Sequence, residues 1–391
     1  HINIPFEEPL YETVPELTSR LAFVPEIKEV VTSEDLTAFA AAWNASSKKM
    51  ILTGVNDPGV LSQDLIDFIG NEASVVVMTE TTSNLHHPNF IAHIDTLITP
   101  FSEKAFLQLQ PEILVTFGGM VVSKRVKAFL RKYKPKQHWH IDVLRAYDTF
   151  GALTSHIKQT PQNFFSFLKE KNKEIASDYA KEITAVFDYR TGKHWHFLEQ
   201  APFSDLKAYE RILEALPAGS MLQISNSAAI RYAQLVPFDN SISVYCNRGT
   251  SGIDGSTSTA IGAAVASPRQ TVLLTGDIGF FYDSNALWNN YIPSNFRIIL
   301  VNNGGGGIFR ILPGHKENTV FNRFFETSHH LDASHLAEMY HFDYYTANDE
   351  QELGEALRCL FSEGGKPAIL EVFTPEKLND KILADYFRAL A

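Results

Sequence analysis

Short apolar runs alternate along this chain with segments of helical periodicity. Two of these runs, Thr271–Leu274 and the run that begins at Arg297, are β-branched and apolar on both faces, which is typical of buried parallel strands. The segment between them, Asp283–Tyr291, is expected to be the crossover helix. Strands that alternate with helices predict an α/β fold with two doubly wound, mainly parallel sheets and helices on both faces.

The same rhythm divides the chain into two α/β units. A helix is predicted over Ser33–Ser46, and a basic helix over Ser123–Tyr133 follows the third strand of the first unit. Four strands are predicted in the first unit and three more in the second, at Met50–Gly54, Ser74–Met78, Ile113–Phe117, Gln137–Val143, Met221–Ser225, Ser243–Cys246 and Ala368–Val372. We therefore expect a linker over residues 1–26, a central domain over 27–170, a connection over 171–203 and a second domain over 204–391.

Composition narrows the class of protein. The chain has 391 residues, of which 45% are apolar, so two full cores are expected. No apolar run approaches the roughly 20 residues of a membrane span. The formal net charge of −11 argues against nucleic-acid or anionic-membrane partners. The only two cysteines, Cys246 and Cys359, do not make a disulfide framework, so a reducing, cytoplasmic setting is expected.

The candidate chemistry lies where two predicted strands end. Gly276 and Asp277 follow the first strand, and Asn302, Asn303 and a run of four glycines follow the second. The carboxyl ends of parallel strands are where open α/β sheets bind ligands. Asp277 offers an anionic oxygen, Asn303 a neutral one, and the glycines allow close backbone approach. This mixture suits a hard divalent ion that carries a diphosphate.

The two pieces lie 26 residues apart and together resemble the signature of thiamine-diphosphate enzymes, a Gly-Asp pair followed by Asn-Asn. One departure is that Ile278 stands where that superfamily usually has a third glycine. The stretch Asn247–Ser256, which reads Asn-Arg-Gly-Thr-Ser-Gly-Ile-Asp-Gly-Ser, is more specific. With Asn226–Arg231 and Gly118–Arg125, it resembles the 2-succinyl-5-enolpyruvyl-6-hydroxy-3-cyclohexene-1-carboxylate synthase family of menaquinone biosynthesis.

The resemblance implies roles for individual residues. Asp277, Asn303 and the carbonyl of Gly305 would hold Mg²⁺, or Mn²⁺, on the diphosphate of thiamine diphosphate. Ile253 would keep the cofactor bent. The residues implied around the cofactor are Ile253, Gly276, Asp277, Ile278, Asn303, Gly305 and Ile308. The residues implied to contact substrate are Lys124, Arg125, Asn226, Ser227, Arg231, Arg248 and Phe309.

The family's substrates, 2-oxoglutarate and isochorismate, are both dicarboxylates. Arginine forks suit carboxylates, and lysine adds a point charge, so these cations fit such substrates. By resemblance, 2-oxoglutarate loses carbon dioxide on the cofactor, and the resulting carbanion equivalent adds to isochorismate. The resemblance also implies a homodimer or a dimer of dimers in the full-length enzyme.

The opening segment His1–Tyr11 resembles the end of the family's first domain. The family's activating glutamate belongs to that domain, and no residue of this chain matches it. We therefore expect this chain to be the C-terminal two-thirds of the enzyme, to hold no catalytic residue of its own, and to be inactive alone. Two alternatives remain open. One is another thiamine-diphosphate decarboxylase or carboligase of the acetolactate-synthase type. The other is a non-catalytic subunit that binds magnesium diphosphate and pairs with a separate chain.

Overall fold

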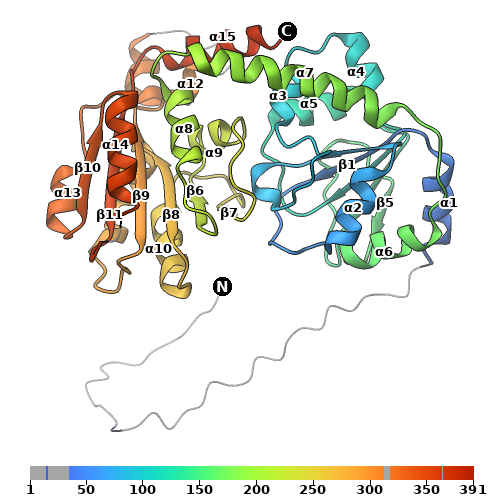
Figure 1. The fold of residues 1–391 in the computed structure, drawn as a ribbon, viewed down its shortest axis with the longest axis horizontal. Coiled ribbons are helices and arrows are strands. Elements are labelled where there is room, and N and C mark those ends of the chain that lie inside the picture. Colours follow the sequence, from blue (N-terminus) through green and yellow to red (C-terminus); the bar gives the residue numbers. More distant parts are fainter. Residues whose placement is uncertain (1–14, 16–34, 312–317, 363) are drawn as a thin grey trace.

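The computed structural model describes Pro15 and residues 35–311, 318–362 and 364–391, which form two α/β units (Figure 1). The linker predicted over residues 1–26 lies, apart from Pro15, outside the described residues. The two predicted sheets are present and every strand pairing in them is parallel, so the predicted fold class is confirmed.

The first sheet has the strand order β2-β1-β3-β4-β5. Its strands are β1 Lys49–Thr53, β2 Val75–Met78, β3 Ile113–Phe117, β4 Gln137–Ile141 and β5 Ser155–Ile157. The helices around it are α1 Thr37–Ala45, α2 Gln63–Asn71, η1 Thr81–Ser83, α3 Ile94–Ile98, α4 Glu103–Leu109, α5 Lys124–Lys132 and α6 Pro161–Lys171. β1, β2 and β3 are buried along their whole length because helices cover both faces of the sheet.

The second sheet has the order β10-β11-β9-β8-β6-β7. Its strands are β6 Met221–Ile224, β7 Ser243–Cys246, β8 Thr271–Gly276, β9 Phe296–Asn302, β10 Asp343–Ala347 and β11 Ala368–Phe373. The helices of this unit are α8 Asp205–Glu214, α9 Ala228–Ala233, α10 Ser256–Ala266, α11 Asp277–Tyr282, η2 Ser284–Trp288, α12 Ile308–Ile311, the π-helix η3 Phe321–Glu326, α13 Ser334–Met339, α14 Glu350–Leu360 and α15 Asn379–Ala389.

Alternate residues of the central strands pack into two separate cores, one on each face of the sheet, in each unit. In the first unit, Ile51 packs into the core under α1, α2 and α6, whereas its neighbour Leu52 packs into the core under α3 and α5. In the second unit, Leu274 and Leu273 divide in the same way between the two faces of the sheet. This two-sided burial follows from the two-residue period of a strand.

One predicted helix is wrong in its bounds. The crossover helix expected over Asp283–Tyr291 instead begins at Asp277, as α11, and continues after Asp283 as the 3₁₀-helix η2. The Asp277 carboxylate accepts a 2.7 Å hydrogen bond from the N–H of Ile278, inside the first turn, where an anion is favourable. Asp283 instead binds the backbone N–H and hydroxyl of Ser258, which ties this turn to α10.

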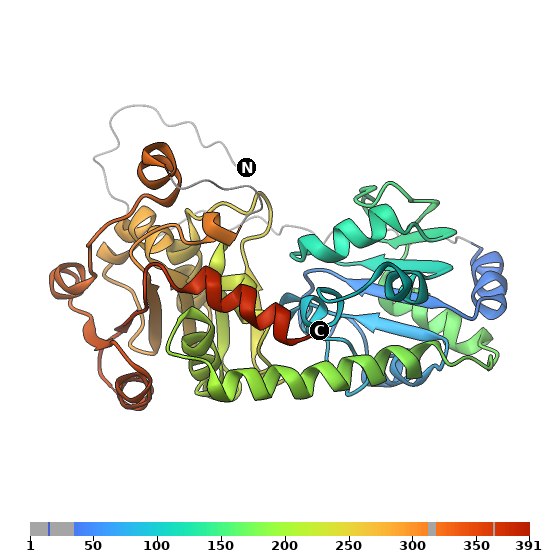
Figure 2. The ribbon, with the colours of Figure 1, turned by 90° about the horizontal axis from the view of Figure 1, so that it is seen from above.

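The helix α7, Tyr179–Gln200, lies along both units (Figure 2). It has 22 residues and occupies most of the predicted connection over 171–203. Within its second half, His194 Nδ1 lies 2.8 Å from the hydroxyl of Tyr386 on α15, and that hydroxyl lies 3.0 Å from Thr96 Oγ1 on α3. Buried polar contacts of this kind hold the two units together. Among the described helices, none is both long and apolar enough to cross a bilayer.

Candidate active site

Asp277 and Asn303 lie at the ends of two neighbouring strands. Gly276 of β8 is the register partner of Val301 of β9, so the residues that follow both strands meet at the carboxyl edge of the sheet. The buried carboxylate of Asp277 accepts a 2.8 Å hydrogen bond from the N–H of Gly305. The structure therefore brings together the three residues predicted to hold a metal.

The amide of Asn303 is oriented by a buried carboxylate. Its Nδ2 donates a 3.0 Å hydrogen bond to Asp205 Oδ2, at the start of α8. Asp205 also accepts from Thr374 Oγ1 at 2.5 Å, just after β11. Because a carboxylate only accepts, the amide nitrogen must face Asp205, and the oxygen Oδ1 is left over. That oxygen is buried and has no hydrogen-bond partner among the described residues.

Asp205 was missed by the sequence reasoning. Burial raises the pKa of Asp205 to about 6, in spite of its hydrogen bonds from Thr374 and Asn303, and the nearby Asp277 adds to the rise. The only sequence signal was its place after Ser204, as an acidic residue in the first turn of a helix. That pattern normally indicates a helix start and carries no information about a partner 98 residues away.

Two glycines after β9 have backbone conformations that other residues rarely adopt. Gly304 has φ +77°, and Gly305 has φ +155°. A Cβ on Gly305 would lie 2.7 Å from the carbonyl oxygen of Glu326. The carbonyl of Gly305 accepts a 3.0 Å bond from Gly307 N–H, which leaves its second lone pair for another partner. Close backbone approach therefore requires glycine here.

His329 adds a fourth group that the sequence did not reveal. Its Nε2 lies 3.3 Å from Asp277 Oδ2. The contact with Asp277 raises the pKa of His329, and burial opposes the rise. A protonated imidazole at this position would stabilise the Asp277 carboxylate.

These donors fit a hard divalent cation. They comprise one anionic carboxylate oxygen, an orphaned amide oxygen and a backbone carbonyl, so phosphate and water oxygens would have to complete the coordination shell. Within the described ranges, no group of three or more His, Cys, Asp or Glu side chains is placed to hold a metal. A metal ion at Asp277 would therefore depend on the neutral oxygens of Asn303 and Gly305 and on the oxygens of a bound phosphate group and water.

The apolar residues implied around the cofactor lie near the same strand end. A Cβ on Gly279, in α11, would lie 3.3 Å from the carbonyl oxygen of Ile253 and 3.9 Å from its Cβ, so Ile253 packs beside the turn that carries Asp277. Ile278 and Ile308 are half-buried. Phe309, beside Ile308 in α12, has its ring edge-on to Phe325 at 5.8 Å between centroids.

Asn226 organises the loop after β7. Its Nδ2 donates to the carbonyls of Asn247, at 2.6 Å, and Gly252, at 2.7 Å. Its Oδ1 accepts a 2.7 Å hydrogen bond from Arg248 Nη1. Asn226 follows β6. From β6 the chain continues to β7 at one edge of the sheet, whereas from β8 it continues in the opposite direction, to β9. Such a switch point is where doubly wound sheets form ligand crevices.

Arg231 and Arg248 are close enough to influence each other. Burial lowers the pKa of the Arg231 guanidinium, and the charge of Arg248 adds to this, whereas Asp95 opposes it. Arg231 Nη1 donates a 2.6 Å bond to the carbonyl of Ser227, a residue with the unusual φ of +72°. Arg248 Nε is buried and has no hydrogen-bond partner within the described part of the chain. Two neighbouring cations, one of which has a buried unused donor, indicate an anion site.

Lys124 and Arg125 open helix α5 of the first unit. The guanidinium of Arg125 lies over the ring of Phe387 in the second unit, 4.4 Å from its centroid, and its Nε is 3.8 Å from Asp95 Oδ2. Asp95 is thus influenced by both Arg125 and Arg231. Lys124 is exposed. One predicted substrate cation of each unit, Arg125 and Arg231, therefore lies near Asp95, another residue that the sequence did not reveal.

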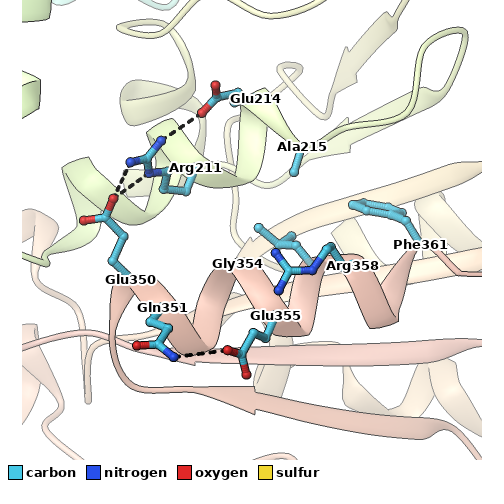
Figure 3. Close-up of a pocket in the computed structure, with 10 residues that line it drawn as sticks. Arg211, Glu214, Ala215, Glu350, Gln351, Gly354, Glu355, Arg358 and Phe361 are labelled. Atoms are coloured by element: carbon cyan, nitrogen blue, oxygen red, sulfur yellow. Dashed lines mark hydrogen bonds and ion pairs between the residues drawn. The ribbon is translucent and has the colours of Figure 1, made fainter.

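A surface groove of about 860 Å³ lies elsewhere, between α8 and α14 (Figure 3). Arg211 crosses it with ion pairs to Glu350 and Glu214. None of the predicted site residues lines this groove. The Arg211 charge in its wall is already paired with Glu350 and Glu214, so the donor chemistry at Asp277, and not this groove, identifies the candidate site.

Two protein families match successive parts of the chain. Residues 227–372 match the family described as "Thiamine pyrophosphate enzyme, C-terminal TPP binding domain", and residues 61–224 match "Middle domain of thiamine pyrophosphate". The predicted domain boundaries stay predictions.

Curated relatives match the chain throughout. The 2-succinyl-5-enolpyruvyl-6-hydroxy-3-cyclohexene-1-carboxylate synthase of Flavobacterium psychrophilum is 59% identical over 390 residues, which are 100% of this chain and 71% of that protein. The synthases of the same name from Flavobacterium johnsoniae and Christiangramia forsetii are 56% and 49% identical, over 100% and 99% of this chain and 71% and 68% of their own lengths. The chain therefore belongs to the family of 2-succinyl-5-enolpyruvyl-6-hydroxy-3-cyclohexene-1-carboxylate synthases, which are thiamine-diphosphate-dependent enzymes.

Proposed function

We propose that this protein decarboxylates 2-oxoglutarate and adds the remaining four-carbon unit to isochorismate, with thiamine diphosphate and Mg²⁺ as cofactors. The observation that carries the proposal is that two groups of functional atoms follow the carboxyl ends of strands in one sheet. Asp277, Asn303 and Gly305 supply hard oxygens after β8 and β9, and Arg231 and Arg248 supply carboxylate-binding cations in the segments after β6 and β7.

Asp277 Oδ2, Asn303 Oδ1 and the carbonyl of Gly305 would hold the metal ion on the diphosphate. The buried Asn303 Oδ1 supports this role, since a buried acceptor without a partner is costly and a cation would satisfy it. The bound cofactor supplies an electron-accepting ring for the pair of electrons left when carbon dioxide departs. Ile253 and Phe309 would exclude water beside it. Mn²⁺ is the alternative ion, because it accepts the same oxygen ligands.

The cations would select dicarboxylates. These cations, Arg231, Arg248, Lys124 and Arg125, come from two units. Asp95 is a counter-charge that influences one arginine of each unit, Arg125 and Arg231. A hydrogen bond from such a cation to a carboxylate contributes about 1.5–3 kcal/mol. A substrate with a single carboxylate, such as pyruvate, would leave part of this set unpaired, which favours the dicarboxylate reaction over an acetolactate-synthase type.

For assembly we propose a homodimer or a dimer of dimers. Large exposed side chains on one stretch of the second unit support it, because contiguous apolar surface usually marks an interface. They are Tyr282, Trp288 and Tyr291, each at least 63% exposed. Light scattering coupled to size exclusion would measure the mass. We also propose a cytoplasmic location, supported by the two free thiols of Cys246 and Cys359.

The test is carbon dioxide release by the protein expressed from its complete reading frame, with thiamine diphosphate and Mg²⁺. We expect turnover of 2-oxoglutarate, coupling to isochorismate, and at least about tenfold lower kcat/KM with pyruvate. Preferred turnover of pyruvate would overturn the proposal. The same assay on the 391-residue chain alone tests the expectation that it is inactive by itself, and robust turnover there would contradict that expectation.

A further inference from the structure

Two acidic residues of the first unit hold the end of α5 that carries Lys124 and Arg125. Glu80 follows β2 and is almost fully buried. Its Oε2 accepts a 2.6 Å hydrogen bond from Val122 N–H, and its Oε1 accepts a 2.7 Å bond from Ser123 N–H. Both carboxylate oxygens are therefore used to hold two successive backbone N–H groups, immediately before the helix begins.

Asp95 holds the same turn from the other side. Ser123 is the N-cap of α5, and its hydroxyl accepts from Val126 N–H at 3.1 Å. The same hydroxyl donates a 2.5 Å bond to Asp95 Oδ1. The second oxygen of Asp95 lies 3.8 Å from Arg125 Nε. Asp95 therefore holds both the cap of the helix and one of its predicted substrate cations.

The turn is also fixed against the second unit. The side chain of Val122, 3% exposed, belongs to the core of that unit, with Ala229, Ile230 and Val244. Val122 thus has its N–H bound to one unit and its side chain packed in the other. Asn84, four residues after Glu80, adds two hydrogen bonds to the backbone of Val244, at 2.8 and 2.9 Å. The distance between α5 and the loop of Arg248 is set by these contacts.

From this geometry we propose that Glu80 and Asp95 are positioning residues, which place Lys124 and Arg125 opposite Arg231 and Arg248 so that cations of both units can bind the carboxylates of one substrate pair. The inference rests on the proposed function and deepens it. Neither carboxylate is assigned contact with substrate. Each acts through the backbone or the guanidinium that it holds.

The chemistry explains why a carboxylate is needed at position 80. Two N–H donors require two acceptors, and glutamine offers only one together with an NH₂ group that would face an N–H. Glu80→Gln is nearly isosteric, so its effect should come from this mismatch. Glu80→Asp keeps two acceptor oxygens on a shorter side chain and should restore part of the loss.

The experiment measures KM for 2-oxoglutarate and for isochorismate, together with the half-saturating concentration of thiamine diphosphate, in the enzyme expressed from its complete reading frame. Glu80→Gln and Asp95→Asn are each expected to raise KM for at least one dicarboxylate about tenfold. Half-saturation by thiamine diphosphate should change less than twofold, because Asp277 lies in the other unit. Glu80→Asp should give an intermediate KM.

Glu112→Gln is the matched control. Glu112 also accepts hydrogen bonds from a backbone N–H and a serine hydroxyl, but it precedes β3 at the opposite edge of the first sheet. Both KM values should stay within twofold of wild type in this variant.

These measurements distinguish failure of the proposed function from failure of the positioning role. If wild type does not turn over 2-oxoglutarate, the proposed function fails, and the positioning role for its carboxylates fails with it. If wild type is active and both KM values stay unchanged in folded Glu80→Gln and Asp95→Asn, only the positioning role is overturned. An equal change in the half-saturation by thiamine diphosphate would show a general structural role and would also overturn it. If Glu80→Gln does not fold, Asp95→Asn alone decides the outcome.

Discussion

The N–H of Gly305 donates a 2.8 Å hydrogen bond to the carboxylate of Asp277. This bond joins the residues that follow two adjacent strands, and both are predicted metal ligands. Because Asp277 Oδ1 also accepts from Ile278 N–H, the carboxylate is held in one orientation before any cation arrives. Preorganisation of this kind reduces the cost of binding.

Replacing the carboxylate of Asp277 should therefore weaken the binding of Mg²⁺ and thiamine diphosphate more than it lowers the free energy of unfolding. Asp277→Asn loses the anionic oxygen and places an amide NH₂ against one of two N–H donors. We expect the half-saturating concentrations of Mg²⁺ and thiamine diphosphate to rise on the order of 100-fold. Titration of intrinsic tryptophan fluorescence would measure both. Asp188→Asn, at an exposed position of α7, is the control and should leave both values unchanged. Equal affinities in the two variants would exclude Asp277 as a ligand.

The glycine run offers a second test. Gly305→Ala would place a Cβ 2.7 Å from the Glu326 carbonyl, at a φ of +155°. We expect the free energy of unfolding to fall by about 1–3 kcal/mol and the affinity for Mg²⁺ to weaken with it. Urea denaturation with and without Mg²⁺ would separate the two effects.

The control for this glycine is Gly192→Ala. Gly192 lies exposed in the long helix α7, where an added Cβ meets no atom within 4 Å. Alanine there should stabilise the protein by about 0.5–1 kcal/mol, since alanine favours helices over glycine. A Gly305→Ala variant as stable as Gly192→Ala would show that the run does not require glycine.

Local pattern was enough to predict nine of the eleven described strands and the neighbourhood of the strand ends, but it missed the edge strands β5 and β10. β3 and β7 have the predicted bounds. The apolar, β-branched run of β3 is buried along its whole length and stops before Gly118, whereas β7 is buried at Ser243 and Val244 and stops before Asn247. The proximity of Asp277 and Asn303 followed from their place after two parallel strands. Sequence distance did not matter, because adjacent parallel strands end at the same edge of a sheet.

Groups defined by long-range contacts could not be predicted in this way. Asp205, Asp95 and Glu80 have ordinary local contexts, and each acquires its partner only when distant segments pack. Glu80, for example, accepts from N–H groups 42 and 43 residues away. The misplaced crossover helix has a related cause. Aspartate often caps the start of a helix, but the carboxylate of Asp283 instead accepts a hydrogen bond from the N–H of Ser258 in α10.

Arg231 should discriminate between substrates. Arg231→Ala removes a guanidinium that is largely shielded from solvent and that also holds the Ser227 carbonyl. We expect KM for a dicarboxylate substrate to rise about 10- to 150-fold, with a smaller effect on any residual pyruvate turnover. Arg231→Lys should recover only part of the loss, because lysine keeps the charge but not the planar fork. A KM unchanged in Arg231→Ala would contradict substrate contact at this position, whatever the thermal stability of the variant.

Buried histidines at the junction of the two units should make the fold sensitive to acid. Burial lowers the pKa of His194 to about 4, and the nearby His93 adds to this. Between about pH 6.5 and pH 4 the unfolded chain takes up a proton at His194 that the folded chain does not, so the free energy of unfolding falls as the pH falls. The shift corresponds to a loss of roughly 3 kcal/mol by pH 4.

Urea denaturation at pH 7 and at pH 4.5 would measure this loss. His194→Gln removes the titrating group and should reduce the loss by roughly 2–3 kcal/mol, although the variant starts less stable at pH 7 because its contact with Tyr386 is weakened. His196→Gln, two residues further along α7 at an exposed position, should behave as wild type at both pH values. If His194→Gln loses as much stability on acidification as His196→Gln does, the buried imidazole is not the source of the acid sensitivity, and the junction between the two units tolerates its protonation.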